Sequence, residues 1–113
     1  MVKYLALLRK KPDWTDAAFR EHWKQVHGPL VAQLPGLVNY VQYHVHSQIA
    51  SNAEQVDEPI QGIAEMWFES EEALKQAMAS PVGQQIAKDV TEFLGENNHF
   101  NHLVTVEETL KFV

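Results

Sequence analysis

The chain has 113 residues, a formal net charge of −6 and no cysteine. This length suits one domain with a single hydrophobic core, and the missing cysteines exclude disulfides and thiolate-bound metals. The acidic balance and the scattered basic residues argue against a nucleic-acid surface. No apolar run is long enough to span a bilayer and no signal peptide is recognisable, so we expect a cytoplasmic protein with no membrane partner.

The first half of the sequence predicts two strands separated by a helix. Residues 2–9 are apolar with charge at both ends, which is typical of a strand. Thr15 is a suitable N-cap for a helix that runs to about Gly28 and continues as a short turn to Leu34. Pro35-Gly36 signals a turn, and residues 37–47 are expected to form the second strand.

The second half predicts two further strands and two helical segments. Residues 47–59 are polar, acidic and without periodicity, so we expect a long loop there that is suited to serve as a lid. A third strand follows over residues 60–68. Ser70 and Ser80-Pro81 are start signals for helices that reach about Met78 and Gly95. Residues 100–113 are expected to form the last strand.

The predicted element order is β-α-β-β-α-β, a split βαβ unit of the α+β class. It gives a four-stranded antiparallel sheet with helices on one face, and we expect one domain over residues 1–113. Both registers of the strands are apolar, however. A sheet with one face in water should alternate cleanly between apolar and polar residues, so the uncovered face predicts a homodimer packed sheet against sheet.

Two histidines flank the apolar stripe of the first helix. Read at 3.6 residues per turn, one helical face carries Phe19, Trp23, Val26 and Leu30. His22 and His27 lie on opposite flanks of that stripe. Pro29 removes the backbone N–H that would bond Gln25, so the helix should kink or stop near Gly28. Free carbonyls beside such a break can orient an imidazole, which favours a site at His27; the alternative is two partly exposed surface histidines.

A second group of candidates lies on the second strand. Tyr40, Gln42 and His44 share one register, so their side chains point the same way. Facing the helices, this register would set a phenol, an amide and an imidazole against an apolar wall, as in most small-molecule sites. The expected wall consists of Trp23, Met66 and Phe68. The alternative is that these strand residues are half exposed and pack on the first helix.

Histidines on the second and last strands raise the question of a metal. His44 and His46 form a His-x-His pair, and His99 or His102 would supply a third imidazole to zinc or iron. No tightly spaced third ligand accompanies the pair, and a solvent-facing polar register is the commoner explanation for it. We therefore predict that the protein binds no metal.

Three motifs occur in order along nearly the whole chain. They are Arg20-x-x-Trp23-x-x-Val26-His27-Gly28-Pro29-Leu30, Pro35-Gly36-Leu37-x-x-Tyr40 and Glu65-x-Trp67-Phe68-x-Ser70. Together they resemble the EthD family, which implies a ferredoxin-like fold, a dimeric α/β barrel and a cleft for a small cyclic or polyketide-like substrate. Relatives by fold include muconolactone methylisomerases, aromatic polyketide cyclases and cofactor-free monooxygenases. In the methylisomerases a working imidazole matches His27 and a cleft tyrosine matches Tyr40, whereas Met66 stands where they have a cysteine.

A histidine can take and return protons at neutral pH. With no cofactor motif, His27, Tyr40 and His44 predict a cofactor-free enzyme that isomerises, cyclises or dehydrates a small cyclic, aromatic or polyketide-like metabolite in catabolism or secondary metabolism. Tyr40 would steady an enolate oxygen. The expected substrate contacts are His22, Trp23, Gln42, Met66 and Phe68. Two alternatives stay open: a cofactor-independent monooxygenase, and a non-catalytic pocket that binds a small molecule or haem, with His27 as hydrogen-bond partner or axial ligand.

Overall fold

The computed structural model describes residues 1–96, 100–105 and 110–113, and for residues 100–105 it describes the backbone alone. In chain order the elements are β1 (Val2–Leu8), α1 (Asp16–His22), η1 (Trp23–His27), α2 (Gly28–Val31), β2 (Leu37–His44), β3 (Gly62–Phe68), α3 (Glu71–Ala79), α4 (Pro81–Phe93) and β4 (Phe100–Thr105). The element η1 is a π-helical turn.

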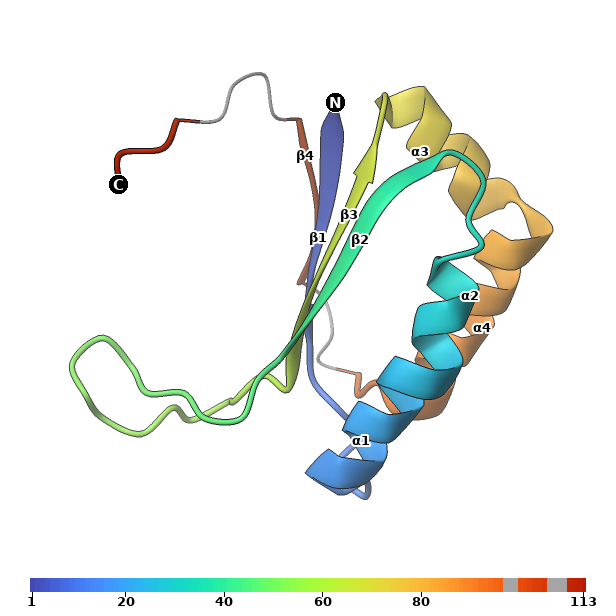
Figure 1. The fold of residues 1–113 in the computed structure, drawn as a ribbon. Coiled ribbons are helices and arrows are strands. Elements are labelled where there is room, and N and C mark those ends of the chain that lie inside the picture. The colour runs from blue at the N-terminus through green and yellow to red at the C-terminus, as the bar shows by residue number, and fades with distance from the viewer. Residues whose placement is uncertain (97–99, 106–109) are drawn as a thin grey trace.

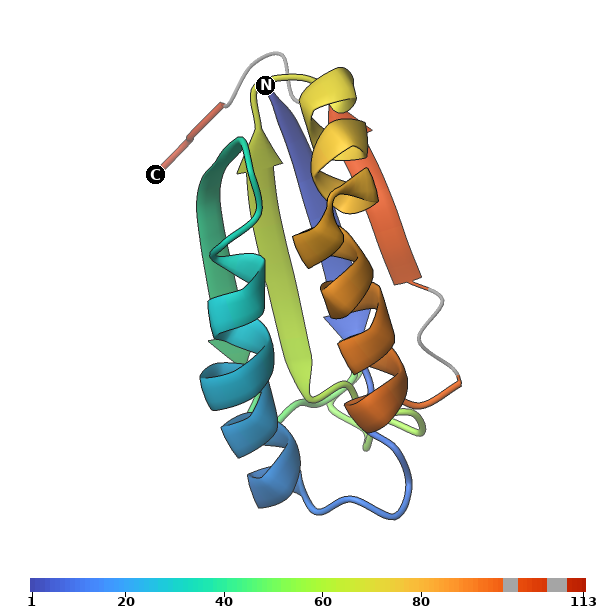
Figure 2. The same cartoon turned by 90° about the vertical axis from the view of Figure 1, so that its right-hand side faces the viewer.

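The strands form one antiparallel sheet in the order β2-β3-β1-β4. The central strands β1 and β3 pair along their whole lengths, with Ala6 opposite Ala64. All the helices lie on one face of this sheet, with α1, η1 and α2 in one row and α3 and α4 in another (Figures 1 and 2). This element order and strand order are those of the ferredoxin-like arrangement.

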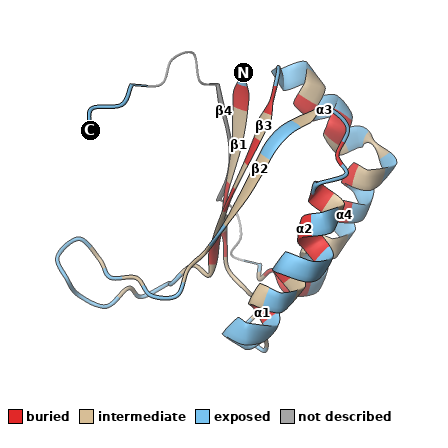
Figure 3. Cartoon of the chain, in the orientation of Figure 1, coloured by how far each residue is buried: buried red, intermediate tan, exposed pale blue. Residues whose placement is uncertain are grey.

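The sheet face beneath the helices carries the hydrophobic core. Alternate residues of β1 and β3 are buried there, as a period of two along a strand requires; they are Val2, Ala6, Leu8, Ala64, Met66 and Phe68. The other register, which includes Leu5, Ile63 and Trp67, is only half buried (Figure 3). No described helix covers that second face, so apolar side chains of the central strands remain open to water in the single chain.

Hydroxyl side chains start three of the helical segments, as predicted. Thr15, Ser70 and Ser80 each accept a hydrogen bond from the backbone N–H three residues further on, at 3.0, 3.1 and 3.1 Å. Each therefore satisfies one of the donors that the first helical turn leaves unpaired. This short-range pairing explains why the starts of α1, α3 and α4 could be predicted from local sequence.

The first helix is distorted near Gly28-Pro29, where we expected it to kink or stop, but it does not end there. It passes through η1 into α2, which ends at Val31, and the backbone N–H of Gly28 donates to the carbonyl of Trp23, five residues earlier. Pro29 has no N–H and so demands no hydrogen bond from this turn. The wider turn changes which side chains face the sheet: His27 is buried, whereas Val26, which we expected in the core, is 47% exposed.

Two further segments differ from expectation. Residues 45–59 project from the side of the sheet opposite to the helices, so this loop does not lie over the helical layer as a lid would (Figure 1). The last strand ends at Thr105 rather than Val113; residues 110–113 form no strand, and residues 106–109 fall outside the described part. None of the helices in the described ranges is long and apolar enough to cross a membrane.

Candidate active site between the sheet and the helices

A cavity of about 320 Å³ lies between the sheet and the helical layer. Its floor comes from β1, β2 and β3, and its walls come from the first helical row and from α3 and α4. The lining residues are Tyr4, Ala6, Leu8, Trp23, His27, Val31, Tyr40, Ala64, Met66, Met78, Gly83, Ile86, Ala87, Val90 and Leu94. Most of these side chains are apolar, and the titratable ones are Tyr4, His27 and Tyr40. A cavity of this size and character is typical of a small-molecule site.

His27 is held in this cavity by a carboxylate of the facing helix. Its Nδ1 lies 2.8 Å from Oδ2 of Asp89 on α4. Nε2 of His22 lies 3.0 and 3.1 Å from the two oxygens of the same carboxylate. The Asp89 side chain is only 12% exposed, so both imidazoles meet it largely out of contact with water. The ring of Phe93 packs against both of them, with centroids 4.7 Å from His22 and 4.9 Å from His27.

This environment determines the protonation of His27. Burial lowers the pKa of His27 below its usual 6.5, and the hydrogen bond and negative charge of Asp89 oppose that shift only in part. The imidazole is therefore neutral at neutral pH. Because an ionised carboxylate only accepts hydrogen bonds, the single ring proton sits on Nδ1. Nε2 keeps its lone pair, and within the described residues it makes no hydrogen bond.

Tyr40 is oriented by an amide on the same strand. Nε2 of Gln42 donates to the phenol oxygen of Tyr40 at 2.7 Å and to the backbone carbonyl of Trp23 at 3.0 Å. A carbonyl only accepts, so it fixes the orientation of the amide. The phenol oxygen thus accepts a hydrogen bond from Gln42 and keeps its own O–H available as a donor. Burial raises the pKa of Tyr40 above 10.0, and the phenol therefore remains protonated.

His44 lies outside the cavity, on the far side of Trp23. Its ring stacks on the indole with centroids 4.6 Å apart, and its Nε2 lies 2.9 Å from Oε1 of Gln42. Since that amide oxygen accepts, Nε2 of His44 is the donor. His44 faces an open surface hollow lined also by Gln42, Arg20 and Lys24. Burial and these neighbouring cations lower its pKa.

The structure thus brings together some of the predicted site residues and separates others. Trp23, His27, Tyr40 and Met66 line the cavity. The four others do not: Phe68 is fully buried in the core, Gln42 and His44 stand behind Tyr40 and Trp23, and His22 stands behind Asp89. The expectation that a free helix carbonyl orients His27 was wrong, because Asp89 does so.

Asp89 is the site residue that sequence reasoning missed. It lies in α4 between two cavity-lining residues, Ile86 and Val90, and close to the buried Phe93. The sequence feature that could have indicated Asp89 is its position at the edge of the apolar stripe of α4, from which a carboxylate can reach a buried interface. Nothing local connects that position to His22 and His27, which are more than sixty residues away in the chain.

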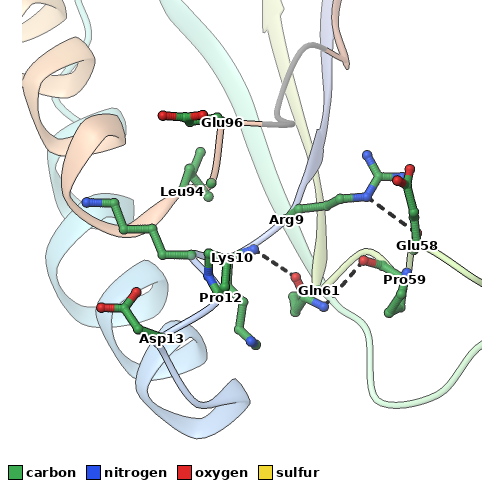
Figure 4. Close-up of a pocket in the computed structure, with 11 residues that line it drawn as sticks. Arg9, Lys10, Pro12, Asp13, Glu58, Pro59, Gln61, Leu94 and Glu96 are labelled. Carbon is green, nitrogen blue, oxygen red and sulfur yellow. Dashed lines mark hydrogen bonds between the residues drawn. The ribbon is translucent and has the colours of Figure 1, made fainter.

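An open basin adjoins the cavity, and Leu94 borders both. It measures about 560 Å³ and is lined by Arg9, Lys10, Lys11, Pro12, Asp13, Glu58, Pro59, Gln61, Leu94, Gly95 and Glu96 (Figure 4). Arg9 donates to the backbone carbonyl of Glu58 at 3.2 and 3.3 Å, and the backbone N–H of Lys10 donates to Gln61 at 2.8 Å. Cations and carboxylates are mixed here, unlike in the uncharged cavity beyond Leu94.

Metal binding finds no support in the described residues. Within them, no group of three or more histidine, aspartate or glutamate side chains is arranged to hold an ion. His46 is exposed. The further histidines weighed as ligands fall outside what the structure describes, His99 entirely and His102 in its side chain.

Comparison with known proteins identifies the family. The EthD domain matches residues 11–97. The chain belongs to the EthD family. An uncharacterised 11.0 kDa protein of Rhodococcus erythropolis, encoded in the thcB-thcC intergenic region, is 34% identical over 97 residues, which span 83% of this chain and 84% of the relative. The resemblance inferred from the three sequence motifs is thereby confirmed.

Solved structures agree with the fold. An EthD family protein from Bacillus halodurans is 29% identical and aligns over 96% of this chain and 99% of its own, with a TM-score of 0.72. SnoaB, a cofactor-independent oxygenase from Streptomyces nogalater, is 14% identical and aligns over 96% of this chain and 95% of its own, with a TM-score of 0.64. The expected α+β ferredoxin-like fold is confirmed, and at such low identity SnoaB supports the fold alone.

Proposed function

We propose that this EthD protein is a cofactor-free acid–base enzyme acting on a small cyclic, aromatic or polyketide-like metabolite. The observation that carries the proposal is the placement of His27, which lines an apolar cavity while its Nδ1 lies 2.8 Å from the largely buried carboxylate of Asp89. A neutral imidazole with a free Nε2 is a general base, and an oriented carboxylate stabilises the imidazolium that forms when it takes a proton.

In the proposed reaction, Nε2 of His27 takes a proton from the carbon next to a substrate carbonyl. The electrons of that C–H bond form an enolate, whose oxygen receives a hydrogen bond from Tyr40. Returning the proton to another carbon completes an isomerisation. Attack of the enolate carbon on a second carbonyl closes a ring, and giving the proton to a departing hydroxyl releases water.

A second candidate is a cofactor-independent oxygenase such as SnoaB, because a base at His27 in an apolar cavity would serve that reaction as well. His27 would deprotonate an electron-rich phenol or hydroquinone, and the resulting anion would itself reduce dioxygen. The first step is the same as in the main proposal, so the two reactions differ in whether oxygen is consumed. An oxygen electrode distinguishes them once a turned-over substrate is in hand.

The uncovered sheet face supports a further part of the proposal: residues 1–113 form one domain that assembles as a homodimer, sheet against sheet. Leu5, Leu7, Ile63 and Trp67 belong to the half-buried register of β1 and β3. Leaving each large apolar side chain in water forgoes about 1.5–3 kcal/mol, a large share of the net stability of a small domain. A second copy would cover them all at once.

Deuterium exchange into 2-tetralone tests the catalytic proposal without knowledge of the natural substrate. This uncharged bicyclic ketone has acidic protons next to its carbonyl, and proton NMR in D₂O follows their replacement. We expect the protein to speed exchange above the buffer rate, and His27→Ala to lower the protein-dependent rate by about 10²-fold or more. Tyr40→Phe should cost less and His22→Ala least.

His46→Ala is the matched control, because it removes an exposed histidine and should leave exchange unchanged. The proposal would be contradicted if the wild-type protein exchanged 2-tetralone no faster than buffer does. It would also be contradicted if His27→Ala exchanged it at the wild-type rate. Loss of exchange in His44→Ala with retention in His27→Ala would move the base to β2.

A further inference from the structure

The charge of the cavity lining limits which ligands it can bind. Among the described residues that line it there is no lysine, arginine, aspartate or glutamate. Its titratable groups are neutral as well: burial raises the pKa of Tyr4 and of Tyr40 and lowers that of His27. An ionised ligand would therefore lose its hydration without gaining a counter-charge, which is strongly unfavourable.

The adjoining basin does not supply the missing charge. Its cations, Arg9, Lys10 and Lys11, lie beyond Leu94 and share the basin with three carboxylates, those of Asp13, Glu58 and Glu96. These opposite charges are mixed, and the basin is open to solvent, where water screens them. A carboxylate seated beside His27 thus has no cation of the cavity lining to pair with.

The polar groups of the cavity have a definite complementarity. Tyr40 presents an O–H donor, since its oxygen already accepts from Gln42. His27 presents an acceptor at Nε2, since its Nδ1 proton is bound to Asp89. Tyr4, the remaining phenol, lines the floor. A ligand that matches this pair carries a hydrogen-bond acceptor and an acidic O–H or C–H.

We infer that the cavity selects uncharged ketones and phenols of one or two fused rings and rejects carboxylates of the same shape. The inference rests on the proposed function, because it names the substrate class of that same site. The volume of about 320 Å³ lies at the lower end of the range for small-molecule sites, about 300–1,000 Å³, so a ligand of one or two fused rings fits inside it.

A matched pair of probes tests this selectivity by calorimetric titration. 2-Acetylnaphthalene and 2-naphthoate have the same number of non-hydrogen atoms, and a methyl group in the first is replaced by a charged oxygen in the second. At about pH 7.5 the carboxylate is ionised, and we expect it to bind at least about 30-fold more weakly than the ketone. Equal or tighter binding of 2-naphthoate, or no binding of the ketone, would overturn the inference.

A charge added at the edge of the cavity should reduce the preference for the ketone over the carboxylate. Met78 lines the cavity and is only half buried, so Met78→Lys introduces an ammonium at its edge. We expect 2-naphthoate to bind at least about tenfold more tightly to this variant than to the wild type. Gln76→Lys adds the same charge at an exposed position of α3 and should change neither affinity. An equal gain in 2-naphthoate affinity in Gln76→Lys would show that the net charge of the protein, and not the lining of the cavity, determines how strongly the carboxylate binds.

These results separate the inference from the proposed function. Binding selectivity is measured without any reaction, whereas catalysis is measured by deuterium exchange into 2-tetralone. Selective binding of the ketone with no exchange would leave the inference standing and defeat the catalytic proposal. Exchange by His27 together with tight binding of 2-naphthoate would do the opposite.

Discussion

His22 and His27 are five residues apart in one helical row, yet both bind the carboxylate of Asp89. In a regular α-helix, residues with this spacing would point about 140° apart. The π-helical turn at Trp23–His27 widens the helix between them and brings both imidazoles to the same side. Such turns are frequent at functional sites, and here the turn carries His27 into the cavity.

Asp89→Asn should disable the base while preserving its shape. The amide still accepts one hydrogen bond but loses the negative charge that stabilises an imidazolium, so we expect exchange into 2-tetralone to fall by about 10²-fold. The free energy of unfolding should fall by about 1–3 kcal/mol, because the largely buried hydrogen bonds to the imidazoles lose their charged acceptor. Glu92→Gln on the exposed side of α4 removes the same charge and should leave both quantities unchanged. Equal losses of exchange and stability in the two variants would show that Asp89 acts only through the net charge of the protein.

The activity should persist into mildly acidic solution. His27 must be neutral to act as a base, and burial lowers its pKa below 6.5. The rate of exchange is therefore expected to stay constant as the pH falls through 6.5 and to drop only below it. Asp89→Asn removes the negative charge that raises this pKa, so it should move the drop to still lower pH. An acid limb centred above 6.5 would show that His27 titrates as an ordinary exposed histidine.

Protein stability should also depend on the protonation of His27 and should fall as the pH is lowered. Below 6.5 the unfolded chain protonates its histidine before the folded chain does, so the unfolded state binds more protons in that window. The His27 contribution to folding is thus fully present above pH 6.5 and is lost as the pH falls through the lowered pKa. Urea unfolding across this range measures the loss. In His27→Gln the free energy of unfolding should depend less on pH. An unchanged pH dependence would show that other groups cause the loss of stability.

The uncovered face of the sheet predicts the oligomeric state, which light scattering can measure. We expect a dimer at micromolar concentration. Trp67→Glu should yield monomers, because it places a carboxylate next to Glu65 on the apolar face and removes the ring over which Lys3 lies at 5.1 Å. Val26→Glu is the control, since Val26 is 47% exposed on the helical layer and should not affect assembly. A monomeric wild type would exclude the sheet-to-sheet dimer.

Local sequence was enough for the parts of this fold that depend on local physics. Thr15, Ser70 and Ser80 bond to N–H groups three residues away, so their pattern is legible in sequence. The buried register of β1 and β3 follows from alternation in the same way. For the register of Tyr40, Gln42 and His44 the sequence left two interpretations open. All three are half buried, Tyr40 reaches the cavity, and His44 packs on Trp23 of the first helical row.

The rest depended on contacts between distant segments. A fixed angle of about 100° per residue placed His22 and His27 on opposite flanks and Val26 in the core, and the π-helical turn alters all three positions. Asp89 could not be assigned because its role exists only when α4 packs beside η1. The direction of the loop at residues 45–59 is likewise a property of the folded chain rather than of its polar composition.

Gly62 and Trp23 provide the last prediction. A Cβ at position 62 would fall 2.5 Å from Cζ3 and 2.7 Å from Cη2 of the indole, and Trp23 is only 1% exposed. Gly62→Ala must therefore displace this ring, which stacks on His44 and adjoins the cavity. We expect a loss of about 1–3 kcal/mol in the free energy of unfolding, as for other overpacked cores, and weaker binding of 2-acetylnaphthalene.

A double-mutant cycle separates this clash from the loss of glycine itself. Trp23→Leu removes the indole and should destabilise the protein on its own, because it leaves a void in the core. Combined with it, Gly62→Ala should cost almost nothing, since the added methyl group then has room. Urea unfolding of the four proteins would give a coupling free energy of about 1–3 kcal/mol. Additive effects would mean that Gly62→Ala destabilises β3 through its backbone conformation and not through a clash with the indole of Trp23.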